Sequence, residues 1–182
     1  MKLLFVCDPV ASFHLAKDST LAMMREADRR GHALWACHTH DLFWLSGQTV
    51  SAQTQRLRIT HDPVAWFDLE PPAVHGLASF DAVLMRKDPP FDSEFFYSTH
   101  LLEQAQREGA LVFNRPAALR DHPEKLAIMD FFRNGQLYEL YGSTEAGWVT
   151  MLHPKEQFTH LGSIGRECIG SRPIRLLDEN GK

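Results

Sequence analysis

The chain has 182 residues, 44% of them hydrophobic and 23% charged, and its formal net charge at pH 7 is -4. This length provides for one hydrophobic core, or for one domain with an appendage. Acidic and basic residues are interspersed, so no basic face for nucleic acid is expected. No apolar run approaches the roughly 20 residues that a membrane helix requires, and three widely spaced cysteines fit a reducing cytoplasm better than a disulfide framework.

The start of the chain predicts a strand, a helix and a second strand. Residues 2–7 form a short apolar run closed by an Asp-Pro pair, which is typical of a buried parallel strand rather than a signal peptide. Residues 17–30 alternate apolar and charged side chains at helical spacing, and Gly31 is a natural stop. With a strand at 32–37 this order is a βαβ unit, for which a right-handed crossover is expected.

The next part adds a hairpin and then resumes the alternation. Residues 41–60 flank a turn-prone segment at 46–48, which predicts a hairpin or meander beside the main sheet. The elements after it are a strand at 80–85, a helix at 93–108, a strand at 110–113 and a short helix at 117–120. Residues 1 to about 116 therefore predict an α/β fold with an open, mostly parallel sheet.

Composition changes after Phe132. The tail, residues 133–182, contains most of the chain's 11 glycines and reads as short strands with no further clear helix. It is therefore expected to be a short β-rich segment. A segment of this length is near the lower limit for independent folding, so we expect it either to dock on the first domain or to be sensitive to proteases.

One candidate binding site follows the strand at 80–85 directly. Arg86, Lys87 and Asp88 stand where the carboxyl end of a central strand would lie, and ligands of open α/β sheets bind at that edge. Arg86 and Lys87 have the charge to hold carboxylates or phosphates. The alternative, which the residues leave open, is a solvated turn whose prolines only end the strand.

A similar group follows the first strand. Asp8 closes that strand, and Lys17, Asp18 and Ser19 precede the first helix. Asp18 or Ser19 is expected to cap the helix. Capping and loop anchoring is one interpretation of this group, and contact with a substrate is the other.

Residues 37–41 combine cysteine, histidine and aspartate within five positions, which raises the question of a zinc site. Adjacent positions in a strand point to opposite faces, however, and no second ligand pair stands at a suitable spacing. The sequence therefore predicts no metal site here.

Two long stretches resemble bacterial glutathione synthetases in order and spacing. Residues 7–32 read CDPVASFHLAKDSTLAMMREADRRGH, and residues 83–126 read VLMRKDPPFDSEFFYSTHLLEQAQREGALVFNRPAALRDHPEKL. The similarity runs to about Phe131 and includes a WFDL element at Trp66. It implies a Rossmann-like, pre-ATP-grasp domain that helps to bind γ-glutamylcysteine.

The resemblance also implies where the chemistry of the family resides. In that family an ATP-grasp domain follows, binds ATP and magnesium, and joins γ-glutamylcysteine to glycine through an acyl-phosphate. Lys125 falls where the family places a lysine that reaches the ATP phosphates. The match ends before the magnesium-binding carboxylates. Residues 1–132 are therefore expected to be catalytically incomplete, with no catalytic residue and no tightly bound cofactor.

The tail resembles a fragment of an adenylate-forming enzyme of the acyl-CoA synthetase superfamily, because it contains the YGSTE motif and similar strands after it. The resemblance implies that the ring of Tyr141 stacks on adenine, and that Thr144 and Glu145 serve phosphate and magnesium. A solvated carboxylate is the alternative for Glu145. The chain thus looks like a splice of two ligase fragments near residues 132–136.

Three hypotheses about function remain. The first is a glutathione-synthetase-like substrate-binding domain that is inactive alone, because catalysis needs acceptor, ATP and metal held together. The second is a structural or interaction module that binds no small molecule. The third keeps ATP affinity through Lys125 and the YGSTE segment. The expected partner is a γ-glutamylcysteine-like molecule rather than nucleic acid or a membrane, the expected location is the cytoplasm, and a homo-oligomer is left open.

Overall fold

A computed structural model of the chain describes residues 1–60, 62, 65–122, 138–143, 147–156, 159–160 and 163–168. The chain divides into two compact units, Met1–Asp121 and His122–Lys182. None of the described helices is both long enough and apolar enough to cross a membrane.

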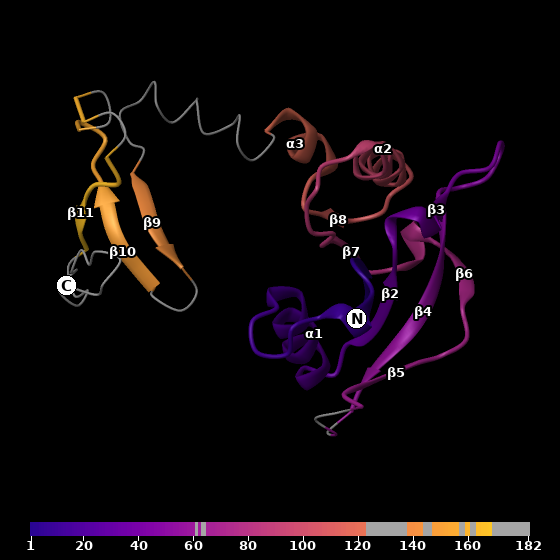
Figure 1. Cartoon of the computed structure of the whole chain (residues 1–182). Coiled ribbons are helices and arrows are strands. Elements are labelled where there is room, and N and C mark those ends of the chain that lie inside the picture. The colour runs from indigo at the N-terminus through magenta and orange to yellow at the C-terminus, as the bar shows by residue number, and fades with distance from the viewer. Residues whose placement is uncertain are drawn as a thin grey trace. The chain divides into compact units, whose positions relative to one another are not determined.

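Four parallel strands form the centre of the first unit (Figure 1). They are β1 (Lys2–Val6), β2 (Ala33–Cys37), β7 (Ala82–Met85) and β8 (Val112–Phe113), and they lie in the order β2-β1-β7-β8. Each lies within an apolar run in which the sequence predicts a strand. The predicted α/β class with a mostly parallel central sheet is confirmed.

An antiparallel part extends this sheet beyond β2. The long strand β4 (Ser51–Ile59) pairs with β2 and with β3 (Leu42–Phe43), which confirms the hairpin predicted over residues 41–60. Two strands that the sequence did not predict, β5 (Phe67–Leu69) and β6 (Ala73–Gly76), also pair with β4. They have three and four residues, too few for a periodic pattern to stand out.

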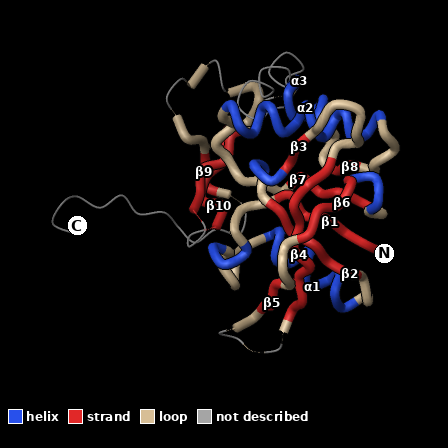
Figure 2. The backbone as a smooth tube through the Cα atoms, turned by 90° about the vertical axis from the view of Figure 1, so that its right-hand side faces the viewer, coloured by secondary structure: helices blue, strands red, loops and turns tan. Residues whose placement is uncertain are grey.

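Helices cover both faces of the sheet (Figure 2). The predicted helices are present as α1 (Ser19–Arg29) and α2 (Ser93–Arg107), and α3 (Pro116–Asp121) matches the short helix predicted at 117–120. Short 3-10 turns lie at Val10–Ser12 (η1), Thr39–Asp41 (η2) and Leu77–Ser79 (η3). Glycines with positive φ follow α1 and α2, so both helices end where the sequence predicts.

Two hydrophobic clusters hold the helices to the sheet. Leu4, Val6 and Val83 face one cluster, which α2 completes with Leu102. Phe5 faces the other cluster, which α1 completes with side chains such as Leu21 and Met24. Successive side chains of a strand point to opposite faces, so β1 contributes to both clusters and lies at the centre of the fold.

The described part of the second unit is a small antiparallel sheet. Its strands β9 (Glu139–Ser143), β10 (Gly147–Leu152) and β11 (Arg166–Glu167) lie in the order β11-β10-β9. This confirms the β-rich character predicted for the tail. Gly165 has φ +89°, and a Cβ there would lie 2.1 Å from the carbonyl of Met151, so the position accepts only glycine.

The N-terminal cap of α1 gives a first test of the fold. One carboxylate oxygen of Asp18 accepts hydrogen bonds from the backbone N–H groups of Thr20 (2.7 Å) and Leu21 (2.9 Å). We expect Asp18→Ala to lower the free energy of unfolding by about 1 kcal/mol, because two helical N–H groups lose their acceptor. Urea denaturation measures the change.

Asp28→Ala is the matched control on the same helix. Asp28 is exposed in the last turn, where a negative charge is unfavourable to the helix dipole, so its removal should leave stability unchanged or slightly higher. Equal losses from the two variants would contradict a specific cap.

Candidate functional site

Polar residues gather where the central strands end at their carboxyl edge. Asp8 follows β1, and Arg86, Lys87 and Asp88 follow β7 directly. Because β1 and β7 are parallel neighbours, with Val6 opposite Met85, their carboxyl ends meet. The structure therefore brings together the two groups of candidate residues, which stand about eighty positions apart in the sequence. We call this arrangement the charged corner, made of Asp8, Ser19, Arg86, Lys87 and Asp88.

An ion pair joins the two sides of the charged corner. The ammonium group of Lys87 lies 2.8 Å from Oδ1 of Asp8, and the backbone N–H of Asp88 donates to Oδ2 of Asp8 at 2.9 Å. The Lys87 ammonium also donates to the carbonyl oxygen of Asp88 at 3.0 Å. Asp8 thus uses both carboxylate oxygens to fix the loop after β7.

The ion pair shifts the pKa of both partners toward the charged form. Partial burial acts to raise the pKa of Asp8, but hydrogen bonds from Lys87 and Asp88 and the nearby positive charge outweigh it, so the pKa is lowered. The hydrogen bond to Asp8 is the main cause of the raised pKa of Lys87. Both groups are therefore charged at neutral pH.

Arg86 fastens the end of β7 to the start of α1. Its Nε donates to the hydroxyl of Thr20 at 3.1 Å, and its Nη2 donates to the hydroxyl of Ser19 at 2.7 Å. Among the described residues these bonds use two of the five guanidinium N–H donors. They also go to neutral oxygens, so the charge of Arg86, unlike that of Lys87, meets no carboxylate in these contacts.

The other two candidates near the first strand have local contacts. Asp18 caps α1, as described above, which agrees with one of the two interpretations left open by the sequence. Lys17 lies in the exposed turn before the helix, where its backbone N–H donates to the carbonyl of His14 at 3.0 Å.

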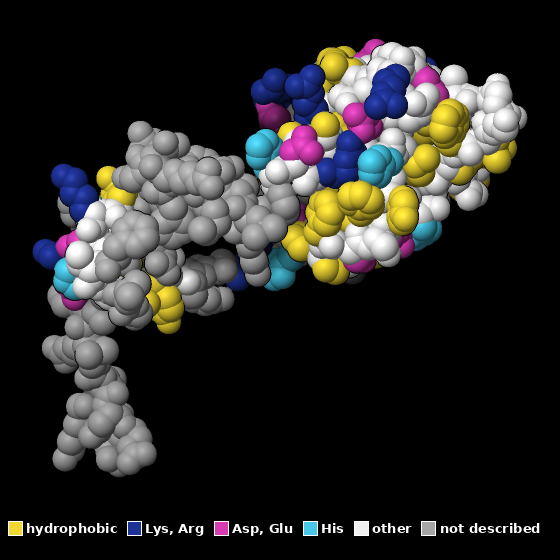
Figure 3. All heavy atoms as spheres, turned by 90° about the horizontal axis from the view of Figure 1, so that it is seen from above, with side chains coloured by type: hydrophobic (Ala, Val, Ile, Leu, Met, Phe, Trp, Pro, Cys, Tyr) yellow, Lys and Arg dark blue, Asp and Glu magenta, His cyan; other side chains and the backbone are white. Residues whose placement is uncertain are grey.

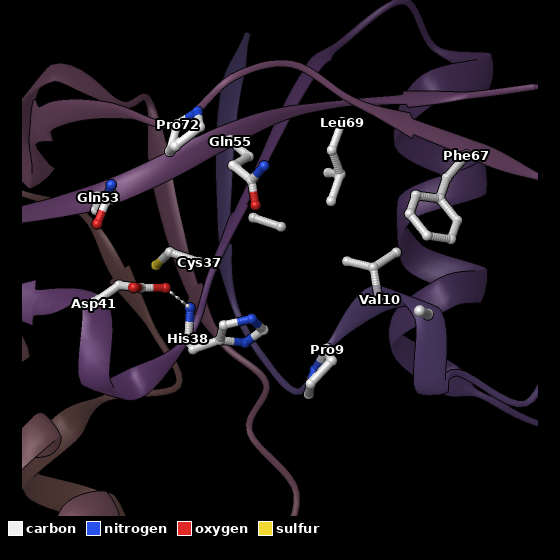
Figure 4. A pocket seen from close by; sticks show the side chains of 12 residues that line it. Pro9, Val10, Cys37, His38, Asp41, Gln53, Gln55, Phe67, Leu69 and Pro72 are labelled. Atoms are coloured by element: carbon white, nitrogen blue, oxygen red, sulfur yellow. Dashed lines mark hydrogen bonds between the residues drawn. The ribbon is translucent and has the colours of Figure 1, made fainter.

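A cavity of about 350 Å³ lies beside the charged corner (Figure 4). Its walls come from η1, the end of β2, η2, β4 and β5, and the loop residue Pro72 closes one side. Sequence reasoning missed this cavity. Gln53 and Gln55 of β4 belong to no motif, and only the pairing of β4 with β2 and β5 brings them to one place with Phe67 of the WFDL element.

The segment considered as a zinc site forms part of this cavity. The backbone N–H of His38 donates to the carboxylate of Asp41 at 2.7 Å, and the His38 Nδ1 lies 3.0 Å from the carbonyl oxygen of Cys7. These contacts form the turn η2 rather than a metal shell. In the parts of the chain that the structure describes, no group of three or more His, Cys, Asp or Glu side chains is placed to hold a metal ion.

Two buried cysteines lie beneath the same edge of the sheet. Cys7 and Cys37 are both free thiols. Burial is the main cause that raises the pKa of Cys7 to about 12, and burial likewise raises that of Cys37. Both thiols are therefore protonated at neutral pH and are poor nucleophiles.

Most of the candidates for nucleotide binding lie outside the described residues. Lys125, Thr144 and Glu145 are among the residues that the structure does not describe. Tyr141 lies on β9 in the second unit and is 55% exposed. Their roles stay predictions.

An open, mostly parallel central sheet covered by helices on both faces defines an α/β domain. Residues 1–120 match the model of the family described as prokaryotic glutathione synthetase, N-terminal domain. The chain belongs to this family, which confirms the resemblance found in its first part.

Three curated relatives, all named glutathione synthetase, illustrate the match. The protein of Ralstonia nicotianae is 52% identical over 131 residues, which are 72% of this chain and 40% of the relative. That of Nitrosomonas europaea is 47% identical over 136 residues, 73% of this chain and 42% of the relative. That of Vibrio parahaemolyticus is 44% identical over 126 residues, which are 69% of this chain and 40% of the relative. The chain thus spans about two fifths of the length of these relatives.

The ion pair of the charged corner predicts how stability depends on pH. Because the pKa of Asp8 is lowered in the folded state, the pair stabilises the protein above the carboxyl's ordinary value of 3.8, and this contribution is lost as the pH falls through the folded-state value. We expect Asp8→Asn to be less stable than the wild type at pH 7 and to lose less stability on acidification. Thermal unfolding at a series of pH values measures both effects.

Asp68→Asn, at an exposed position of β5, is the control with the same change of charge. Its pH profile should follow that of the wild type. If Asp8→Asn also followed the wild-type profile, the ion pair would have no part in the stability of the folded state.

Proposed function

We propose that this chain contributes the substrate-binding domain of a glutathione synthetase, the ligase that joins γ-glutamylcysteine to glycine at the expense of ATP. Membership of the family and the names of the relatives support the proposal. The relatives are more than twice as long as the part that matches, and we assign the chemical step to that further length. By itself the chain is then a binding domain without turnover.

The observation that carries the proposal is the position of Arg86 in the charged corner. γ-Glutamylcysteine has two free carboxylates, and a guanidinium held in a fixed orientation is suited to grip one of them with two parallel hydrogen bonds. The hydroxyls of Ser19 and Thr20 hold Arg86 without neutralising it. Lys87 is already paired with Asp8, so its role is to fix the loop after β7.

ATP and magnesium enter this proposal only because the resemblance to the family implies them. Within the described ranges no cluster of acidic or histidine side chains fits a magnesium ion, and the lysine proposed to reach the ATP phosphates, Lys125, is not described. The residues of the charged corner therefore bind and orient the substrate in this proposal, and none of them is assigned a step with ATP.

For the tail we keep the proposal of a fragment from an adenylate-forming enzyme. What supports it is that the first half of the YGSTE motif lies on β9 and that the ring of Tyr141 is accessible for stacking. The motif by itself does not supply a complete nucleotide site, so in this proposal the tail has no activity of its own.

A second candidate function is that of an interaction module, which one surface feature favours. Phe91, Phe96 and Tyr97 lie around the start of α2 and are 39% to 67% exposed, and the ring of Phe96 contacts the other two. Figure 3 shows hydrophobic side chains gathered between charged ones on the surface of the first unit. Exposed aromatic clusters of this kind occur at protein contacts, including those between copies of one chain.

The first test of the proposal concerns turnover. With γ-glutamylcysteine, glycine and Mg-ATP, the purified chain is expected to release no phosphate above background, because a binding domain alone does not bring the reactants together with ATP. A coupled phosphate assay measures this. Turnover at an enzyme-like rate, on the order of 1 s⁻¹, would show that the chain is a complete ligase.

The second test concerns Arg86. Titration calorimetry of the full chain with γ-glutamylcysteine is expected to detect binding, and Arg86→Gln to weaken it by about tenfold or more, the effect of losing a charge-assisted hydrogen bond. Arg58→Gln removes an exposed arginine of β4 that is paired with Glu70, and it should leave the affinity unchanged. Equal affinities of the wild type and Arg86→Gln, or no binding by the wild type, would refute the role of the charged corner.

A further inference from the structure

The cavity beside the charged corner has one polar wall and one apolar wall. Gln53 and Gln55 are two positions apart on β4 and point to the same side of the sheet, as Phe67 and Leu69 do on β5. Val10 of η1 is almost fully buried on the apolar side. Figure 4 shows the glutamines, His38 and Asp41 on one side of the space, with Val10, Phe67 and Leu69 on the other.

The polar wall presents hydrogen-bond acceptors. Nδ1 of His38 lies 3.0 Å from the carbonyl oxygen of Cys7, a contact that holds the ring against the end of β1. The side-chain NH₂ of Gln55 donates to the carbonyl oxygen of Glu70 at 3.2 Å, which orients the amide and turns its oxygen into the cavity. The carboxylate of Asp41 is a second acceptor beside it.

The charge of the cavity favours a cation. Among the described residues, its lining includes the carboxylate of Asp41 but neither a lysine nor an arginine. The adjacent charged corner differs from the cavity, because it contains two cations, of which Lys87 is paired with Asp8 and Arg86 is bonded to hydroxyl groups. A positive charge in the cavity would meet the carboxylate of Asp41 and the amide oxygen of Gln55, whereas an anion would be repelled by the carboxylate.

We propose that this cavity binds a small organic ammonium ion with a short apolar chain. An ammonium group has a positive charge and three N–H donors, which suit the carboxylate of Asp41 and the amide oxygen of Gln55. A chain of a few methylene groups matches the wall of Val10, Phe67 and Leu69, and a volume of about 350 Å³ is ample for such a molecule. The assignment is independent of the proposed role in glutathione synthesis, because it uses none of the residues of the charged corner.

The test uses n-butylammonium chloride as the probe and the full chain labelled with ¹⁵N. Titration at constant ionic strength is expected to shift the side-chain amide signals of Gln53 and Gln55 with a dissociation constant on the order of 1 mM, the range for a ligand of so few atoms. Sodium butyrate and 1-butanol have the same chain without the positive charge. They should leave these signals in place, and equal shifts with either compound would overturn the proposal.

Two pairs of variants distinguish the effect of charge in the cavity from a general disturbance of the structure. Asp41→Asn removes the negative charge but keeps an oxygen to accept from the His38 N–H, and it should weaken binding of the probe about fivefold or more. The same change at Asp68, which lies between Phe67 and Leu69 and points to the opposite face of β5, should have no effect. Gln53 is exposed, so both Gln53→Lys and Gln53→Met should fold. Only Gln53→Lys should abolish binding, and unchanged affinity in Asp41→Asn and Gln53→Lys would contradict the proposal.

A final titration identifies the source of the ammonium group. γ-Glutamylcysteine also carries one, so competition between it and n-butylammonium at the glutamine signals would assign the cavity to that group of the substrate. Simultaneous binding would assign it to a separate amine. Either result supports an ammonium site. The absence of butylammonium binding would overturn this proposal alone, whereas a failure of the Arg86 test would overturn only the proposed role of the charged corner.

Discussion

The first unit depends on one constraint, the burial of β1 on both of its faces. Leu4, Phe5 and Val6 are 0%, 1% and 0% exposed although they point to alternate sides of the sheet. A strand that is apolar on both sides needs a covering layer on each, and α1 and α2 supply these layers. Val6 pairs with both Cys37 and Met85, so the three central strands end level with one another, and the polar residues that follow them meet at one edge.

The carboxyl edge carries two adjacent cations, Arg86 and Lys87, and the structure holds them in two different ways. Lys87 is neutralised by Asp8, and the ion pair fastens the loop after β7. Arg86 is held by hydroxyl groups instead, which fix its direction and keep its charge. The two cations thus differ in their partners, which are a carboxylate for Lys87 and hydroxyl groups for Arg86, although they are adjacent in the sequence and of similar type.

Sequence patterns predicted those helices and strands whose pattern of apolar residues lies within one continuous segment. The four central strands, both long helices and the hairpin of β3 and β4 are of this kind, because an apolar run or a helical period marks each one. The position of each polar group after its strand was also predicted, since the residue after a buried parallel strand lies at the carboxyl edge whatever the rest of the fold. What the residue types did not reveal was their pairing, which made Lys87 a partner of Asp8 and left Arg86 to the hydroxyls of α1.

The cavity was not predicted, because its lining comes from several segments and no single one of them shows a pattern that indicates it. Gln55 becomes an oriented acceptor only because Glu70, fifteen positions later, takes its NH₂ group, and β5 has too few residues for its pattern to be recognised. The order of the strands then arranges the chemistry along the edge. Acceptors lie at β4 and β2, the Asp8 carboxylate at β1, and the guanidinium of Arg86 at β7. Because the sheet order is β4-β2-β1-β7, the acceptors of the cavity lie toward one end of the edge and the guanidinium of Arg86 toward the other, and this arrangement follows from topology rather than from any local motif.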